Sequence, residues 1–307
     1  MSDSDAAAKS RGLRLFLSVD IAGSTSYKGG RPSSNSLSRA RVAPGSTASV
    51  AWIELYEEFY NDFPTLFARL LGEAIKVVKF VDKELPDRLR LWKILGDELI
   101  FVVRITSAAD ADAVLLAFHR ALKDYQANIK KKHATLALKG TAWTAGFPIR
   151  NCRVELRRFA NKEQQVIDYI GPDIDIGFRL TKLARPGSIV ASMDLVDILL
   201  NKGIRSEFRC VFVGWERMKG VFADKPYPVH WLVYGREPHI LPPWEGSIDR
   251  FAERYEQQQV RGFEDEQAVL GRIEKTREFL NRDERLELFS PYFDDAGMPE
   301  HHRTIYE

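Results

Sequence analysis

The order of strand-like and helix-like segments in the first half of the chain limits its fold more than any other feature. Short apolar runs bounded by turn residues predict buried strands, and apolar residues at spacings of three and four predict helices with one buried face. The segments follow one another in an order typical of a ferredoxin-like sheet. The series is a strand at 13–19, a helix at 51–71 with Pro64 as a candidate kink, strands at 89–95 and 99–105 around a Gly96-Asp97-Glu98 hairpin turn, a helix at 108–131 and a strand at 135–146.

The predicted fold class is therefore α+β, with helices on one face of an antiparallel-rich sheet. After Pro242-Pro243 the composition becomes charged and helix-favouring. We divide the chain into a flexible N-terminus at 1–12, a main domain at 13–240 and a C-terminal helical extension at 241–307. The later predicted elements are an exposed strand at 152–158, a helix at 172–183 and strands at 189–191, 208–213 and 229–234, and the apolar anchors of the extension are Phe251, Tyr255, Phe263, Val269, Ile273 and Phe279.

Composition excludes several classes of function. A net charge of +2 gives no basic nucleic-acid footprint. No apolar run approaches the roughly 20 residues that cross a bilayer, and the polar segment 1–11 lacks a signal core, so we expect a cytoplasmic protein without membrane contact. Cys152 and Cys210 have no metal-ligand spacing and are read as reduced core thiols. Residues 27–49 are rich in Ser, Gly, Arg and Pro, which predicts a long surface loop.

Two acids stand out by position, because each ends or follows a hydrophobic strand. Asp20 ends the first strand and Asp97 lies in the hairpin turn. In a ferredoxin-like sheet these two places are adjacent, so the carboxylates can hold two divalent ions, and hard oxygen ligands suit Mg²⁺ or Mn²⁺. One ion would lower the pKa of an attacking hydroxyl while the other holds phosphates. The small-residue turn at Gly23, Ser24 and Thr25 would let backbone N–H groups approach those phosphates.

Four motifs in order resemble the class III adenylate and guanylate cyclases. Residues 16–25, FLSVDIAGST, resemble the first metal-binding strand of that family, and residues 92–98, WKILGDE, resemble its second metal hairpin. Residues 168–179, DYIGPDIDIGFR, resemble the segment with base-selecting and transition-state residues, and residues 218–220, MKG, resemble a late motif near a phosphate lysine. The resemblance covers about residues 13–234 and implies a metal-dependent nucleotide cyclase domain.

The resemblance also implies roles for single residues. Asp20 and Asp97 would hold the metals, with the Ile21 carbonyl assisting, and Arg179 would neutralise charge that develops at the α-phosphate. Lys93 and Asp168 fall where adenylate cyclases read the base.

Two positions depart from the family pattern. Asp175, the second candidate catalytic residue beside Arg179, stands where the family often has Asn, so an acid there would need a partner such as Arg179. Val221 stands where the phosphate lysine is usual. The candidates to replace that lysine are Lys219, Lys225, Lys28, Arg31, Arg39 and Arg41.

A narrower resemblance concerns residues 140–148, GTAWTAGFP, the Ser-rich loop and the helical tail. Together they look like the stand-alone pyrimidine cyclases of bacterial Pycsar antiphage systems, which implies cyclic UMP or cyclic CMP as the product and a separate effector that senses it. UTP is the expected substrate. Trp52 or Tyr56 is a candidate to exclude purines by its size.

Several alternatives stay open at the level of sequence. The same Lys93 and Asp168 suit an adenylate cyclase, and a catalytically inactive cyclase-fold module or a palm-type polymerase or diguanylate cyclase could also place two acids on adjacent strands. One chain carries both the metal acids and Arg179. A two-fold homodimer would then contain two equivalent sites at its interface, as the resemblance implies.

Overall fold

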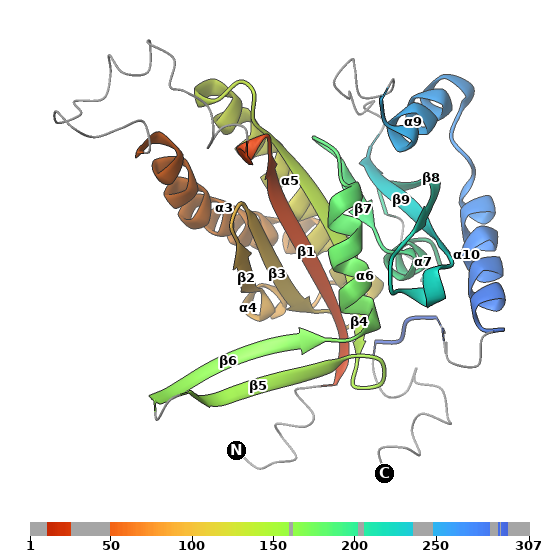
Figure 1. Ribbon diagram of the computed structural model, residues 1–307, viewed down its shortest axis with the longest axis horizontal. Helices are drawn as coiled ribbons and strands as arrows, with labels where there is room; N and C mark the ends of the chain where they lie inside the picture. Colours follow the sequence, from red (N-terminus) through yellow and green to blue (C-terminus); the bar gives the residue numbers. More distant parts are fainter. Residues whose placement is uncertain are drawn as a thin grey trace.

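A computed structural model describes residues 11–25, 50–159, 162–201, 206–235, 248–282, 288 and 290–293 of the chain. These residues form one mixed α/β body with a projecting two-stranded arm and a helical C-terminal segment (Figure 1). The elements are β1 Gly12–Ala22, α3 Val50–Val77, α4 Leu85–Arg88, β2 Arg90–Leu95, β3 Glu98–Arg104, α5 Ala108–Lys132, β4 Ala137–Phe147, β5 Cys152–Phe159, β6 Lys162–Ile170, α6 Pro172–Leu180, the 3₁₀ turn Thr181–Leu183, β7 Ile189–Ala191, α7 Met193–Asn201, β8 Phe208–Arg217, the 3₁₀ turn Phe222–Asp224, β9 Pro226–Tyr234, α9 Arg250–Arg261 and α10 Glu266–Leu280.

The main sheet has seven strands in the order β2-β3-β1-β4-β7-β9-β8. All neighbours pair antiparallel except β4 and β7, which are parallel. β1 lies inside the sheet, with Asp20 opposite Glu98 of β3 on one side and Lys139 of β4 on the other. The α+β class and the antiparallel-rich sheet predicted from the sequence are confirmed.

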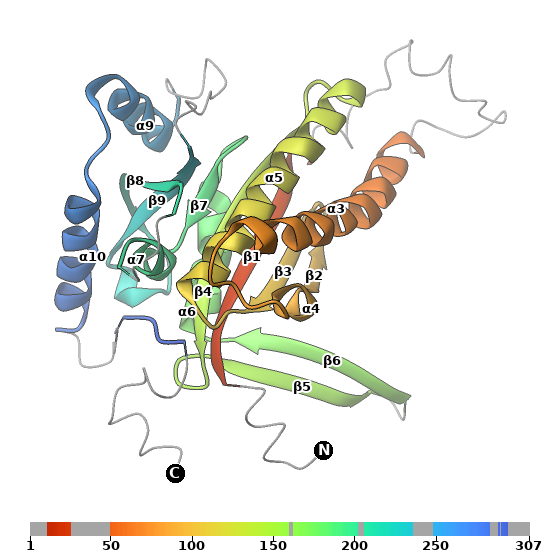
Figure 2. The same cartoon turned by 180° about the vertical axis from the view of Figure 1, so that it is seen from behind.

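Helices α3 and α5 cover one face of the sheet, as the two views in Figures 1 and 2 show. Side chains alternate across a strand, so every second residue of β1 faces these helices. Leu13, Leu15, Leu17 and Val19 belong to that core and are at most 2% exposed. Aromatic residues of α3, such as Phe63, pack against β3 and α5. This dry face holds the sheet and the two long helices together.

Helix α6 lies on the opposite face of the sheet (Figure 1), which differs from the prediction that helices cover one face only. It packs very closely on β4, because a Cβ atom at Gly177 would be 2.1 Å from the Trp143 ring. Phe16 and Ile174 join Trp143 in this second, smaller core. The arm β5–β6 leads directly into α6 and pairs only with itself.

The C-terminal helices share the main core. Phe251, Tyr255, Val269 and Ile273 are buried against the β8–β9 end of the sheet and α7, as members of the cluster that also contains β1. Phe279, expected as an anchor, is 51% exposed, and that expectation is wrong. The residue falls on the outer side of α10. The division of the chain at residue 240 stays a prediction.

Several other differences follow from tertiary context. The 51–71 helix continues to Val77 without ending at Pro64, and the pattern missed strand β6 and helix α7. Cys210 is buried, but Cys152 is exposed at the start of the arm and is not a core thiol. The loop predicted at 27–49 and residues 1–10 of the N-terminal segment predicted at 1–12 lie outside the described residues. Gly12, predicted to belong to that segment, is the first residue of β1. Among the described helices, none has the length and hydropathy of a membrane span.

Candidate active site

The two acids singled out by the sequence lie side by side at one end of the sheet. Asp97 occupies the tight turn between β2 and β3, and its backbone carbonyl accepts a hydrogen bond of 3.3 Å from the Ile21 amide. Asp20 directly precedes Ile21 in the chain, and its side chain lies on the face of the sheet that carries α6. The adjacency follows from antiparallel pairing, which brings the last residues of β1 to the first residues of β3.

A local framework holds the Asp97 carboxylate. The Ser24 hydroxyl, which is buried, donates a hydrogen bond to Asp97 Oδ2. Gly23 has φ +87°, and a Cβ there would be 3.3 Å from the Thr135 carbonyl, so the turn after β1 needs glycine. The turn 22–25 therefore positions a metal-ligand candidate through Ser24. Its predicted role, with Gly23 and Thr25, in contacting phosphates stays a prediction.

Sequence reasoning missed two charged neighbours of the acids. Lys139 of β4 places Nζ 2.8 Å from Asp20 Oδ2. Glu98 accepts a hydrogen bond from the Ser18 hydroxyl and lies opposite Asp20 in the sheet. A strand order with β1 between β3 and β4 would have predicted both residues, because the antiparallel register places Glu98 and Lys139 on either side of Asp20.

Electrostatics at this end of the sheet favour a bound cation. Burial raises the pKa of Asp20, Lys139 lowers it, and the charge of Asp97 raises it further. Burial likewise raises the pKa of Glu98, opposed by the Ser18 hydrogen bond, with Asp20 and Asp97 adding to the rise. The carboxylates of Asp20, Asp97 and Glu98 thus lie close to one another beside Lys139, and a divalent ion would relieve their mutual repulsion.

The donor set fits a metal shared with a substrate. Within the described part of the chain, no group of three or more His, Cys, Asp or Glu side chains is arranged to hold a metal ion by itself. Asp20, Asp97 and the Ile21 carbonyl would supply only part of an oxygen shell, and Mg²⁺ commonly takes one or two carboxylates plus phosphate oxygens. The geometry therefore suits metal binding together with a triphosphate.

The two residues expected to read the base are in contact. Lys93 Nζ on β2 lies 2.8 Å from Asp168 Oδ1 on β6, although the residues are far apart in sequence. The side chains are 30% and 43% exposed, so a ligand can reach both. The pair faces the same side of the sheet as Asp20, because Lys93 is opposite Ile100 of the α6-side core.

An aromatic block fills the space behind this pair. Trp92 lies 5.2 Å from Tyr169 and 6.0 Å from Phe178 between ring centroids, and Lys93 Nζ is 4.5 Å from the centre of the Trp92 ring. Trp143 lies 6.1 Å from Phe178. The indole N–H groups of both tryptophans are buried without a hydrogen-bond partner among the described residues. The floor below Lys93 and Asp168 is thus occupied by large rings.

Arg179 and Asp175 lie one helical turn apart on α6. Arg179 is half-buried, and its Nε atom is buried without a partner among the described residues. Asp175 is exposed. No hydrogen bond or ion pair joins these two described side chains, so the expected pairing of Asp175 with Arg179 is absent. Arg179 keeps a donor available for a ligand, whereas Asp175 has no contact that assigns it a role.

The remaining candidates are not gathered at the two acids in one protomer. Lys219 follows β8 and is exposed. The register of β7, β8 and β9 puts it at the end of the sheet away from Asp20. Lys225 instead lies 5.7 Å over the Phe279 ring. Lys28, Arg31, Arg39 and Arg41 lie outside the described residues.

The two residues named as purine excluders lie elsewhere in the protomer. Trp52 and Tyr56 contact each other on α3, with ring centroids 5.8 Å apart. Helix α3 covers the face of the sheet opposite Lys93. The expectation that either ring fills the base site is therefore not met within one protomer.

Comparison with known proteins shows which solved structures have a similar fold. No family model matches the sequence, and no curated protein matches it. Among solved structures, the adenylyl cyclase CyaB from P. aeruginosa is similar with a TM-score of 0.51 and 16% identity, over 74% of this chain and 96% of that one. The guanylate cyclase domain of RhGC from Catenaria anguillulae in complex with GTP gives a TM-score of 0.46 and 12% identity, over 74% of this chain and 98% of that one. The likeness to CyaB shows that this chain has the fold of a class III cyclase catalytic domain.

Proposed function

We propose that the protein is a class III nucleotide cyclase. The observation that carries this proposal is the meeting of Asp20 and Asp97 on adjacent strand ends of a cyclase fold, joined through the Ile21 amide. In the reaction, the 3′-oxygen of a nucleoside triphosphate attacks its own α-phosphorus and diphosphate leaves. The 3′-hydroxyl proton is lost, so the product is a 3′,5′-cyclic monophosphate.

Asp20, Asp97 and the Ile21 carbonyl would hold two divalent ions, Mg²⁺ or Mn²⁺. When bound, the ions would acidify the 3′-hydroxyl and neutralise phosphate charge. Lys139 is paired with Asp20, so its ammonium lies next to the proposed position of the phosphates. We assign Lys139, in addition to Lys219, as a candidate phosphate contact, because the family lysine is replaced by Val221. Arg179 would donate to charge developing at the α-phosphate.

For the base we propose a pyrimidine, with UTP as the main substrate. Asp168 can accept from uracil N3–H while Lys93 donates to a carbonyl. The aromatic block of Trp92, Tyr169 and Phe178 supports a small base, because it leaves large rings where the second ring of a purine would need room. Cyclic UMP would then act as a second messenger in the cytoplasm for a separate effector, as in an antiphage system.

An adenylate cyclase is the second candidate. The same pair can serve adenine, with Asp168 accepting from the amino group and Lys93 donating to a ring nitrogen. The likeness to an adenylyl cyclase concerns the fold and does not distinguish the bases.

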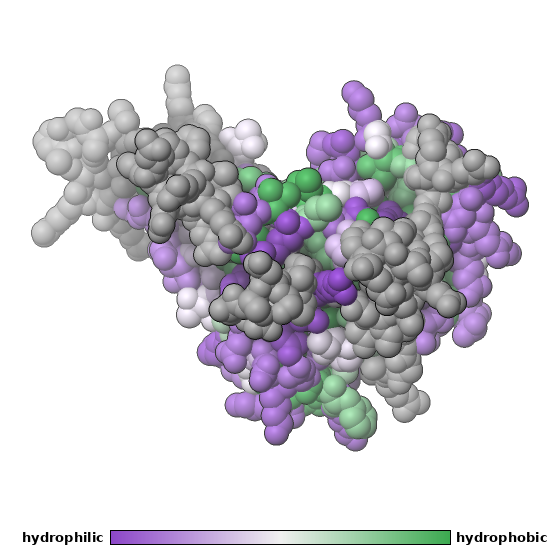
Figure 3. All heavy atoms as spheres, turned by 90° about the horizontal axis from the view of Figure 1, so that it is seen from below, coloured by the Kyte–Doolittle hydropathy of each residue, from purple (hydrophilic) through white to green (hydrophobic). Residues whose placement is uncertain are grey.

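A homodimer would complete the site. The Lys219 turn and the two acids lie at opposite ends of one sheet, so a head-to-tail partner could bring them together. Apolar side chains that are at least 40% exposed gather on the edge strand β2 and on the arm, which supports an interface there. Figure 3 views the molecule from the side of the arm, where hydrophobic patches interrupt a largely hydrophilic surface. The exposed apolar residues of β2 and the arm are Leu91, Ile94, Leu95, Val154, Val166 and Ile170.

Product analysis tests the function directly. The purified protein is incubated with equal concentrations of ATP, GTP, CTP and UTP and with Mn²⁺, and the cyclic products are separated by mass spectrometry. Cyclic UMP as the main product supports the proposal in full. Cyclic AMP as the main product assigns the adenylate cyclase reading, and no cyclic product with any triphosphate indicates an inactive module.

Mixing two inactive variants tests the dimer. Asp20→Ala and Arg179→Ala proteins would each lack one half of every site. Subunit exchange should restore one intact site per mixed dimer if the halves come from different protomers. Proven mixed dimers without recovered activity would show that each site lies within one chain.

A further inference from the structure

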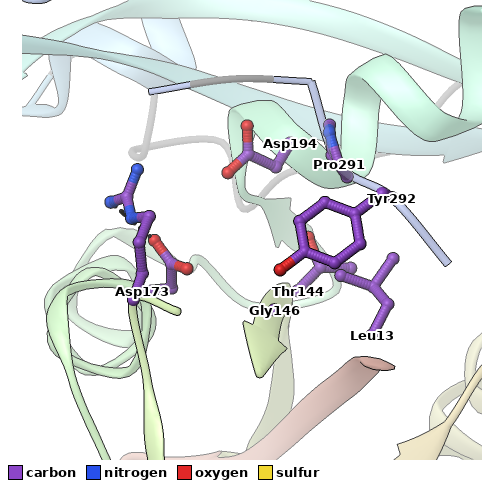
Figure 4. A pocket seen from close by; sticks show the side chains of 8 residues that line it. Leu13, Thr144, Gly146, Asp173, Asp194, Pro291 and Tyr292 are labelled. Atoms are coloured by element: carbon purple, nitrogen blue, oxygen red, sulfur yellow. Dashed lines mark ion pairs between the residues drawn. The ribbon is translucent and has the colours of Figure 1, made fainter. Parts of the chain in front are cut away.

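A small, partly open cavity lies at the end of the sheet away from Asp20. It has a volume of about 30 Å³ and lies between the end of β4, the start of α6, the start of α7 and the C-terminal segment (Figure 4). A cavity of this size holds about two water-sized particles. Its lining residues are Leu13, Thr144, Gly146, Arg150, Asp173, Asp194, Pro291 and Tyr292.

Among the residues that the structure describes, the charged side chains at and next to the cavity do not balance. Arg150 pairs with Asp173 at 2.8 Å, and Arg277 pairs with both Asp194 and Asp197 at 2.6 Å. Asp197 and Arg277 do not line the cavity but join it through Asp194, so the connected group has three carboxylates and two guanidinium groups. Asp173, Asp197 and Arg277 are at most 7% exposed, so water screens them poorly. A buried charge without compensation is costly, and these five side chains carry one net negative charge when all are ionised. Burial and the charge of Asp194 raise the pKa of Asp173, whereas a bound cation would favour its ionised form.

A hydroxyl in the same cavity lacks a partner. Thr144 is 3% exposed, and its Oγ1 atom has no hydrogen-bond partner in the described part of the chain. It lines the cavity together with the carboxylates of Asp173 and Asp194 (Figure 4). A buried hydroxyl is normally hydrogen-bonded or bound to an ion. The unpartnered Thr144 oxygen is a second observation, separate from the net charge, and it also indicates a bound cation in this cavity.

We propose that this cavity binds a monovalent alkali cation of the size of Na⁺. The available ligands are hard oxygens from Asp173, Asp194 and Thr144, which suit a hard cation. One positive charge balances the cluster, whereas a divalent ion would leave an excess. The absence of any group of three His, Cys, Asp or Glu ligands among the described residues also disfavours a transition metal. The side chain of Asp194 is 22% exposed, which offers a route of entry.

The cation would join the C-terminal segment to the start of α6. Asp173 lies in the first turn of α6, the helix that carries Arg179, and Asn151 fixes it by donating to Asp173 Oδ2 at 2.7 Å. Asp194 is tied to α10 through Arg277. The ion would therefore connect the tail to the helix with the proposed transition-state arginine, by a site that does not depend on the proposed cyclase activity.

Thermal unfolding tests the proposal without any substrate. The full chain is prepared free of alkali ions and unfolded in choline chloride or NaCl at equal ionic strength. Binding to the folded state at about ten times Kd should raise Tm by roughly 3 °C in NaCl. Thr144→Val keeps the shape of the side chain but removes the ligand oxygen, so it should lose this rise. Thr141→Val is a matched control, because Thr141 is a buried threonine of the same strand that does not line the cavity.

A direct measurement decides the case if Thr144→Val fails to fold. Crystals of the unchanged protein are soaked in thallium(I), a heavy monovalent cation, and the anomalous density is inspected at the cavity. A peak within bonding distance of Asp173, Asp194 and Thr144 supports the site. Density for ordered water without an anomalous peak, or equal Tm values in choline and sodium salts, would overturn it.

Discussion

The two faces of the sheet use the same strands for different purposes. On the face covered by α3 and α5, alternate residues of β1 from Leu13 to Val19 enter a dry core. On the other face the intervening residues are Arg14, Phe16, Ser18 and Asp20, one apolar and three polar. The first face has no described side chain that the proposed chemistry uses. The difference shows that period-two alternation lets one strand stabilise the fold and present a site at the same time.

We expect the largest effect from removing a charged side chain on the face of the sheet that carries α6. Asp97→Asn keeps the size of the side chain but loses the negative charge that would hold a metal, so turnover should fall by about 10³-fold or more. The Tm should change little, because Asn still accepts a hydrogen bond from Ser24. Steady-state assays and thermal unfolding measure the two quantities. Asp62→Asn on the exposed side of α3 serves as the control, and near-normal turnover in Asp97→Asn would refute the metal assignment.

A substitution on the face covered by α3 and α5 should lower stability and leave turnover unchanged. Phe63 is fully buried, and its ring lies 6.0 Å from Phe101 and 5.7 Å from Tyr125. Phe63→Ala should lower the free energy of unfolding by about 4 kcal/mol, because a large cavity remains. Molecules that stay folded should keep their turnover. Urea titration gives the stability. Phe80→Ala is the control, since Phe80 is 92% exposed and should change stability by less than about 0.5 kcal/mol.

A glycine pair probes how tightly α6 is set on the second face. Gly177→Ala puts a methyl group 2.1 Å from the Trp143 ring, so α6 must shift, at a cost of about 2 kcal/mol. The shift would also move Arg179, so turnover should fall. Gly271→Ala in α10 meets no atom within 4 Å and should be neutral or slightly stabilising. Equal stabilities of the two variants would contradict the close packing of α6.

The smallest effect concerns the choice of base. Trp92→Val removes a large ring below the Lys93–Asp168 pair, so the use of ATP relative to UTP should rise by about tenfold. Competition assays with both triphosphates give this ratio of kcat/KM values. Trp215→Val, which changes a tryptophan that is 41% exposed, should leave the ratio unchanged. A ratio that stays the same in Trp92→Val would mean that another part of the molecule excludes purines.

Local patterns predicted the regular elements well where a single face decides them. The helix near 108–131 and the strands around the Asp97 turn appear within one residue of their predicted bounds, because each has one apolar stripe or alternation. The helix predicted at 51–71 begins as expected but continues to Val77. β6 was missed for a different reason. It is a strand of an arm that pairs with β5, and its first four residues, 162–165, are polar and give no apolar signal.

The sequence by itself determined the order of the main strands and helices from β1 to β4, the α+β class and the two acids at strand ends. These features depend on local periodicity and on the position of a residue in its own segment. Only the tertiary structure decided which residues meet. Lys139 contacts Asp20, and Lys93 contacts Asp168, because strand order and register join positions that are distant in the chain. The tertiary structure also places α6 on the face of the sheet opposite α3 and α5, where Gly177 allows the helix to pack closely on Trp143. Pairing across a sheet is a non-local property, and the alternation within one strand contains no record of its neighbour.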